Sequence, residues 1–166
     1  MNIVLIGMPG CGKSTVGVLL AKALGYDFID GDLLIQKKCG MKLQDIINKQ
    51  GIEAFLAEEE TVLSSLEAEQ SVIATGGSAI YSETAMKHLK KNALTLYISL
   101  PLGEIERRLT NIRTRGVAMS AGMTVADLYA QRCPLYEKYA DITLHAADLT
   151  VEETVERAAA LIEEHN

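Results

Sequence analysis

Gly7 to Ser14 form the segment whose residue types and spacing most clearly predict chemistry. The segment reads GMPGCGKS, fits the pattern G-x-x-x-x-G-K-[ST], and lies between an apolar run and an amphipathic stretch. Glycines let backbone N–H groups turn around phosphate oxygens, Lys13 can reach the outer phosphates, and the Ser14 hydroxyl can bind Mg²⁺. The pattern predicts a site for a nucleoside triphosphate and Mg²⁺, formed by Gly10, Cys11, Gly12, Lys13, Ser14 and Thr15.

Two carboxylates, Asp30 and Asp32, follow the next apolar run of the chain. Open α/β sheets bind ligands at the carboxyl ends of their strands, so both side chains are expected near the phosphates. One carboxylate can then hold the metal while the other accepts a proton from a substrate hydroxyl. A simpler interpretation stays open at this point, namely a turn in which Asp32 is the N-cap of a helix.

A phosphate-binding loop does not by itself define the reaction. Guanine-binding GTPases generally carry Asn-Lys-x-Asp, whereas Asn48 and Lys49 are followed here by Gln50 and Gly51 in a helical stretch. A GTPase is therefore disfavoured. The chain has 22 acidic and 16 basic residues, with a net charge of -6, which argues against a surface that binds nucleic acid.

Short apolar runs alternate with amphipathic stretches along the chain, which is typical of repeated βα units in an α/β fold. We expect strands at residues 2–6, 27–29, 71–75, 94–99 and 141–144. We expect helices at 12–24 and 102–109, and a last helix that begins after Thr150. Residues 32–67 are expected to be mostly helical, so a helical insert interrupts the series of strands.

Two capping boxes mark further helix starts. Thr150 with Glu153 opens the last helix, and Thr124 with Asp127 opens a helix that should carry Arg132 near its end. Helical spacing in the last helix predicts a buried stripe made of Val151, Val155, Ala158, Ala159 and Ile162.

The acidic run Glu58-Glu59-Glu60 is expected to form a solvated helix face. The buried side of the same helix should be supplied by Phe55, Val62, Leu63 and Leu66.

The whole composition fits one globular domain, because 166 residues are enough for a single core but not for two catalytic domains. The first residues lack a basic region, and no segment approaches about 20 apolar residues, so neither a signal peptide nor a membrane span is expected. Three scattered cysteines favour reduced thiols in the cytoplasm. Three isolated histidines lack metal-ligand spacing, so no zinc site is expected.

Over nearly its whole length the chain resembles the shikimate kinase family, within the wider group of nucleoside-monophosphate-kinase-like P-loop proteins. The resemblance rests on Gly7 to Thr15, Phe28 to Asp32, Gly51 to Phe55, Ala74 to Gly77 and Arg132 to Tyr136. It implies a three-layer P-loop kinase fold with a five-stranded parallel sheet and flanking helices. It also implies a substrate-binding helical insert at about 32–67 and a lid at about 111–123 within one domain of residues 1–166.

The same resemblance implies roles for the residues at the phosphates. Lys13 would contact the phosphates, Ser14 would hold Mg²⁺, and Asp30 would assist the metal through its shell. Asp32 would bind and deprotonate the substrate hydroxyl. Arg108 would flank the adenine.

For the acceptor and the lid, the resemblance implies that Gly76 and Gly77 lie against the substrate, followed by Ser78. Arg132 would pair with the substrate carboxylate. Arg115 is the first candidate for the lid arginine that reaches the phosphates, and Arg113 is the alternative.

The chain departs from the family pattern on the acceptor side. Leu56 follows Phe55 where the family has an arginine that grips the substrate carboxylate, and Ser78 replaces the third glycine of a Gly-Gly-Gly turn. The lid sequence Arg-Pro-Leu-Leu appears as Arg115 followed by Gly-Val-Ala. We expect Leu56 to face the acceptor pocket and to make it less polar.

The leading hypothesis is a monomeric enzyme that transfers the γ-phosphoryl group of ATP, with Mg²⁺, to a small-molecule hydroxyl, with shikimate as the first acceptor. One alternative is a related kinase that acts on a different hydroxy acid or polyol. Another is a nucleotide-binding regulatory module without phosphotransfer. The presence of both Asp30 and Asp32 favours an enzyme.

Overall fold

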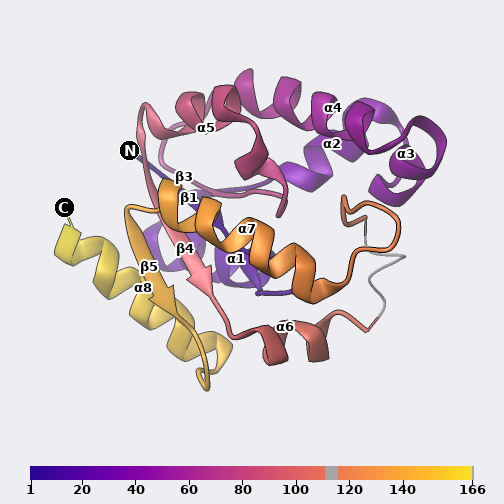
Figure 1. Cartoon of the computed structure of the whole chain (residues 1–166). Helices are drawn as coiled ribbons and strands as arrows, with labels where there is room; N and C mark the ends of the chain where they lie inside the picture. The colour runs from indigo at the N-terminus through magenta and orange to yellow at the C-terminus, as the bar shows by residue number, and fades with distance from the viewer. Residues whose placement is uncertain (111–115, 166) are drawn as a thin grey trace.

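A five-stranded parallel sheet forms the centre of the molecule (Figure 1). The computed structural model describes residues 1–110 and 116–165. Within them the strands are β1 (Asn2–Ile6), β2 (Asp27–Asp30), β3 (Ser71–Ala74), β4 (Ala93–Ser99) and β5 (Ile142–His145). Their order is β2-β3-β1-β4-β5, and the five expected strands are confirmed to within one residue at each end.

Helices cover both faces of this sheet. The connection from β1 to β2 runs toward one edge of the sheet, and the connection from β3 to β4 runs toward the other edge. Because both connections are right-handed, the helices in them lie on opposite faces of the sheet. α1 (Lys13–Leu24) packs against α8 (Val151–His165) on one face, and α5 (Glu83–Lys90) and α7 (Val125–Tyr139) contact β4 from the other (Figure 1). All five residues of β1 are buried, as expected for a strand between two helical layers.

α5 is a helix that the sequence interpretation missed. Its sequence ETAMKHLK is short and half polar, and only Ala85, Met86 and Leu89 are buried. The side chain of Ser82 caps it by accepting a hydrogen bond from the backbone N–H of Ala85 at 3.0 Å. A single N-cap serine without a capping box was too weak a signal to mark the helix.

The two predicted capping boxes are confirmed at Thr124 and Thr150. The predicted stripe of α8 is confirmed at Val155, Ala158 and Ile162, which are buried. Val151 is 39% exposed, so its place in the stripe was wrong, because it is the first helical residue and lies before the buried turns. No helix among the described residues combines the length and apolar character needed to cross a bilayer.

The helical insert between β2 and β3 is confirmed as α2 (Gly31–Cys39), α3 (Leu43–Gln50) and α4 (Ile52–Ser64). It has a small hydrophobic core of its own, made of Ile35, Leu43, Ile46, Phe55 and Ala118. Ala118 comes from the segment that precedes α7, beyond α6 (Leu102–Arg108). The insert and the described part of the predicted lid are therefore packed together beside the sheet (Figure 1).

Candidate active site

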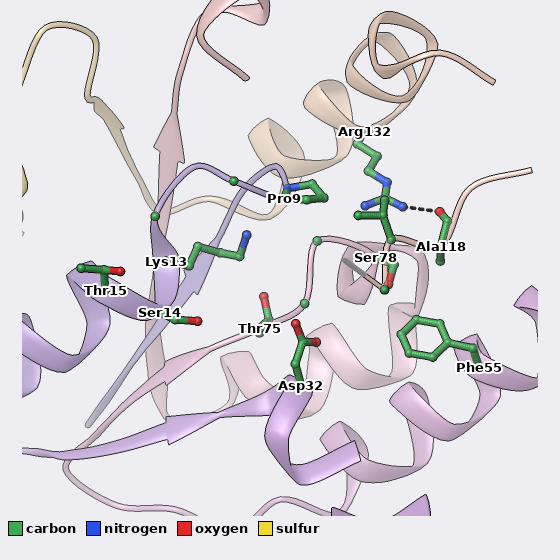
Figure 2. A pocket seen from close by; sticks show the side chains of 16 residues that line it. Pro9, Lys13, Ser14, Thr15, Asp32, Phe55, Thr75, Ser78, Ala118 and Arg132 are labelled. Atoms are coloured by element: carbon green, nitrogen blue, oxygen red, sulfur yellow. Dashed lines mark hydrogen bonds between the residues drawn. The ribbon is translucent and has the colours of Figure 1, made fainter. Parts of the chain in front are cut away.

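The loop between β1 and α1 wraps around the N-terminus of α1. Gly12 precedes the helix with a φ of 96°, a left-handed conformation that would strain a residue with a side chain. Lys13 is buried behind the loop, and its Nζ donates hydrogen bonds to the carbonyl oxygens of Gly7 at 2.7 Å and Met8 at 3.0 Å. Its ammonium group points into the pocket that Figure 2 shows.

Asp30 lies between the loop and α2. Its Oδ2 accepts a 2.9 Å hydrogen bond from the hydroxyl of Ser14, and its Oδ1 accepts from the backbone N–H groups of Asp32 and Leu33. Asp30 is thus the N-cap of α2, so the simpler interpretation with Asp32 as the cap is wrong. The paired hydroxyl and carboxylate oxygens of Ser14 and Asp30 are the hard donors that Mg²⁺ prefers, and they fit this metal.

One pocket of about 200 Å³ joins this loop to the insert, the β3 turn and α7. Its phosphate side is formed by the loop with Lys13 and Ser14, and its far side by Phe55, Ser78 and Arg132 (Figure 2). Ten of the residues predicted for the site line it: Gly10, Gly12, Lys13, Ser14, Thr15, Asp32, Gly76, Gly77, Ser78 and Arg132.

Asp32 lies between the two sides of the pocket (Figure 2). Burial raises the pKa of its carboxyl group to about 6, the negative charge of Asp30 adds to the rise, and the positive charge of Lys13 opposes it. A carboxyl group with a pKa just below neutrality is ionised at neutral pH and basic enough to accept a proton from a hydroxyl.

Arg132 is the largest fully buried side chain of the described residues. Its Nη2 donates a 2.6 Å hydrogen bond to the carbonyl oxygen of Ala118, and its Nε donates to the hydroxyl of Tyr81 at 3.2 Å. The guanidinium also lies over the Tyr81 ring, 5.3 Å from its centroid. Arg132 lies in the middle of α7 rather than near its end, because the helix continues through Pro134 to Tyr139.

Tyr136 supports the Gly77 side of the pocket from one turn further along α7. The sequence alone assigns this residue no role. Its buried hydroxyl donates a 2.6 Å hydrogen bond to the carbonyl oxygen of Gly77, and its ring stacks on Tyr97 with centroids 5.2 Å apart. Its spacing of four residues from Arg132, which puts both on one face of the helix, was the available signal.

Gly76 and Gly77 are positions with no room for a side chain. A Cβ on Gly76 would lie 2.6 Å from both Asp32 Oδ1 and Glu59 Oε2. A Cβ on Gly77 would lie 2.9 Å from Nη1 of Arg132. The turn therefore brings its backbone directly against three charged side chains.

Glu59 overturns the prediction of a solvated acidic face. It is only 2% exposed, and its Oε1 accepts a 2.6 Å hydrogen bond from the hydroxyl of Ser78. Its neighbour Glu58 is half-buried and forms an ion pair with Lys38, and Glu60 is exposed and accepts a hydrogen bond from Ser82. Three consecutive glutamates do not by themselves indicate which one faces inward. The available signal was helical spacing, because Glu59 lies three residues after Leu56 and four after Phe55 and so shares their side of the helix.

Leu56 does not line the pocket that contains Lys13 and Arg132, contrary to expectation. It lines a smaller pocket that adjoins the first at Ser78 and also contains Glu59 and Tyr81. The reason is helical geometry, because Phe55 takes the position facing the main pocket and turns Leu56 to its side. The two departures from the family pattern, at positions 56 and 78, thus meet in one small cavity around Glu59.

Among the described residues, three that were predicted for the site lie outside the lining of this pocket, namely Asp30, Cys11 and Arg108. Cys11 is buried in the loop, with its Sγ 3.7 Å from Lys13 Nζ. Arg108 lies across the loop, where its Nη1 donates to the carbonyl oxygen of Gly10 at 3.3 Å and its Nε donates to Glu104. Arg115, like the alternative Arg113, lies outside the described residues.

Similarity to known proteins agrees with this geometry. A family model described as shikimate kinase matches residues 9–163. The chain belongs to the shikimate kinase family. It is 38% identical to the shikimate kinase of Thermodesulfovibrio yellowstonii, in a match that covers 94% of this chain and 91% of that protein.

Solved structures of the family have the same fold. The shikimate kinase of Acinetobacter baumannii in complex with shikimate matches with a TM-score of 0.90 and 30% identity, over 99% of this chain and 94% of that one. The shikimate kinase of Aquifex aeolicus matches with a TM-score of 0.86 and 32% identity, over 99% and 98% of the two chains. The predicted P-loop kinase fold is confirmed.

Membership of this family makes the chain a phosphotransferase that uses ATP and Mg²⁺ and acts on a hydroxyl group. The prediction of an enzyme is confirmed, and the interpretation as a regulatory module without phosphotransfer is not supported.

Proposed function

We propose that the protein transfers the γ-phosphoryl group of ATP to a hydroxyl of shikimate, giving shikimate 3-phosphate. One arrangement supports this most directly: Asp32 lies between a phosphate side with Lys13 and Ser14 and an acceptor side with Arg132. A carboxylate at this position can accept the hydroxyl proton while the acceptor oxygen faces the phosphates.

The loop from Gly10 to Thr15, including Cys11, would bind the phosphates through backbone N–H groups at the N-terminus of α1. Lys13 would leave its contacts with the loop carbonyls and bind phosphate oxygens. Ser14 and Asp30 would hold Mg²⁺, which neutralises phosphate charge when bound. Arg108 crosses the loop at Gly10 and would lie beside the adenine.

On the acceptor side, Arg132 would bind the shikimate carboxylate. Its Nε and Nη2 already have partners, so Nη1, which faces Gly77, is the group directed toward the acceptor. A guanidinium held by two hydrogen bonds is preorganised to bind a carboxylate. Gly76, Gly77 and Ser78 would form the adjoining wall.

We assign Arg115 as the lid residue that reaches the phosphates, with Arg113 as the alternative. The next described residue, Gly116, lines the pocket and is held to the insert by a 3.3 Å hydrogen bond from its N–H to Oε1 of Gln44. Gly116, which directly follows Arg115 in the sequence, thus lies at the pocket.

In this proposed function, residues 1–166 form a single P-loop kinase domain with its insert at about 32–67 and its lid at about 111–123. It includes a monomer in the cytoplasm, where the three free cysteines would stay reduced.

A second acceptor, a different hydroxy acid or a polyol, is favoured by one observation. Position 56 carries no cation, and in the described part of the pocket Arg132 is the cation on the acceptor side. A charge-assisted hydrogen bond contributes about 1.5 to 3 kcal/mol to binding. Without a cation at position 56, an acceptor with less negative charge therefore loses less binding free energy than shikimate does.

The experiment is steady-state ADP release with shikimate and a panel of hydroxy acids and polyols. Release that depends on shikimate, with a kcat/KM above that of every other acceptor, supports the proposal. Background turnover with shikimate and clear turnover with another member of the panel supports the second acceptor instead.

A further inference from the structure

Glu59 is a buried acidic side chain for which the proposed reaction has no role. It lies on α4, is 2% exposed, and belongs to a helix turn that faces the β3 turn. Its Oε1 accepts the 2.6 Å hydrogen bond from Ser78, whereas its Oε2 is sealed from water and has no hydrogen-bond partner among the described residues. A buried charged oxygen without a hydrogen-bond partner destabilises the folded protein, so the state of Oε2 needs an explanation.

The unpartnered oxygen lies near Asp32. A Cβ on Gly76 would lie 2.6 Å from Glu59 Oε2 and 2.6 Å from Asp32 Oδ1, so both oxygens border the same side of this glycine. Two carboxylates in one buried site repel each other, and the site is stable when one of them keeps a proton. Because position 76 is a glycine, no side chain occupies the space that these two carboxyl oxygens border.

The charged groups around Glu59 come from three helices: Lys13 from α1, Asp32 from α2 and Arg132 from α7. Burial raises the pKa of Glu59 to about 7, the Ser78 hydroxyl opposes this rise, Asp32 adds to it, and Arg132 and Lys13 oppose it. On α4 itself, the residue one turn before Glu59 is the apolar Leu56.

We propose that Glu59 keeps its proton in the working enzyme and uses it to position Asp32. Ser78 donates to Oε1, and Oε2–H donates toward Oδ1 of Asp32, which leaves the other oxygen of Asp32 directed at the acceptor. The proton stays on Glu59 throughout, so Glu59 is a positioning residue and does not itself react. This role rests on the proposed function of Asp32.

The proposed role of Glu59 explains why leucine occupies position 56 and serine occupies position 78. A cation at position 56 would enter the small pocket around Glu59 and favour its ionised form, whereas leucine does not. The Ser78 hydroxyl fixes the orientation of the neutral carboxyl group. The two departures from the family pattern thus act together on Glu59.

Two variants test the role of the proton. Glutamine at position 59 keeps an acceptor for Ser78 and an N–H donor for Asp32, so Glu59→Gln should retain kcat within about 3-fold. Glu59→Ala removes both and should lower kcat at least about 10-fold, with the KM for ATP unchanged. Glu60→Gln, on the adjacent exposed residue, is the matched control and should behave as the unaltered protein. A Glu59→Gln variant as slow as Glu59→Ala would overturn the proposal.

The pH dependence of activity is a second test, because a purely structural role of Glu59 would not alter it. Activity of the unaltered protein should fall as pH rises through about 7, when Glu59 loses its proton, and this alkaline decline should be absent in Glu59→Gln. A decline that persists in Glu59→Gln would contradict the proposal. These assays use whichever acceptor supports turnover. If Asp32→Asn keeps full turnover, the role of Asp32 is wrong independently of Glu59.

A direct titration needs neither an acceptor nor turnover. The ¹³C resonance of the Glu59 carboxyl group, assigned by its absence from Glu59→Gln, is followed with pH in the protein without nucleotide. A midpoint near 7 supports the proposal even if shikimate is not the acceptor. A midpoint near the ordinary glutamate value of 4.5 overturns it.

Discussion

Arg132 and Ala118 connect α7 to the described part of the proposed lid through a 2.6 Å hydrogen bond from a guanidinium N–H to a backbone carbonyl. The residue proposed to bind the acceptor therefore also holds the first described residues of the lid. Ala118 in turn is packed with Phe55 in the core of the insert. The buried Arg132 thus links the proposed acceptor site to both the insert and the proposed lid.

Arg132→Lys should raise the KM for shikimate at least about 10-fold and leave the KM for ATP within about 3-fold. Lysine keeps the positive charge but cannot make several directed hydrogen bonds in one plane. Steady-state kinetics with each substrate varied in turn measure the two values. Equal increases in both KM values would indicate that the variant disturbs the whole pocket rather than acceptor binding.

Gly116→Ala should displace the base of the lid from α3. Gly116 has a φ of 72°, and a Cβ there would lie 2.5 Å from Cβ of Leu43. Gly122→Ala is a matched control, since Gly122 has a φ of 82° and nothing within 4 Å of its Cβ position. We expect kcat/KM to fall at least about 10-fold in Gly116→Ala and much less in Gly122→Ala. Equal losses would mean that backbone strain, not contact with Leu43, sets the effect.

Leu56→Arg should lower the KM for shikimate, whereas its kcat should fall because the added cation favours the ionised form of Glu59. Position 56 borders the small pocket with Glu59 and Ser78, next to the acceptor side, so a guanidinium there adds a cation within reach of that side. One charge-assisted hydrogen bond of about 1.5 to 3 kcal/mol corresponds to roughly 10-fold to 150-fold in affinity. The KM for shikimate is the measurement, with Leu56→Met as an uncharged control. An unchanged KM would show that acceptor binding does not depend on this position.

Glu59→Gln should stabilise the folded protein at alkaline pH. The pKa of Glu59 is about 7 in the folded chain and 4.5 in the ordinary state, so between these values the folded protein holds the additional proton. The free energy of unfolding of the unaltered protein therefore falls as pH rises through this window. Denaturant titration should give the variant an advantage on the order of 2 to 3 kcal/mol at pH 8 and almost none at pH 4. A constant difference across pH would contradict the raised pKa.

Most of the fold could be predicted from the sequence because its signals are local. Buried parallel strands such as β1 are continuous apolar runs, and the capping boxes at Thr124 and Thr150 mark helix starts by themselves. α5 was missed because its buried positions are few and its cap is a single serine. Local patterns fail where a helix depends mainly on what it packs against.

The site could be predicted only in part. The phosphate side follows from a pattern whose residues are adjacent in the chain. The acceptor side depends on distant pairs such as Glu59 with Ser78 and Tyr136 with Gly77, and no local spacing encodes them. Leu56 was placed in the wrong pocket for the same reason, since a shift of one helical position changes which cavity a side chain faces.

The most direct test is to identify the product by ³¹P NMR in a mixture of the protein, ATP, Mg²⁺ and shikimate. We expect ADP and an equal amount of a phosphate monoester on shikimate. The rate should fall by roughly 10²-fold or more in Asp32→Asn, because general-base catalysis contributes about 10² to 10⁴. Phosphorylated shikimate that fails to form although ATP binds, or that forms at full rate in Asp32→Asn, would contradict the proposed function.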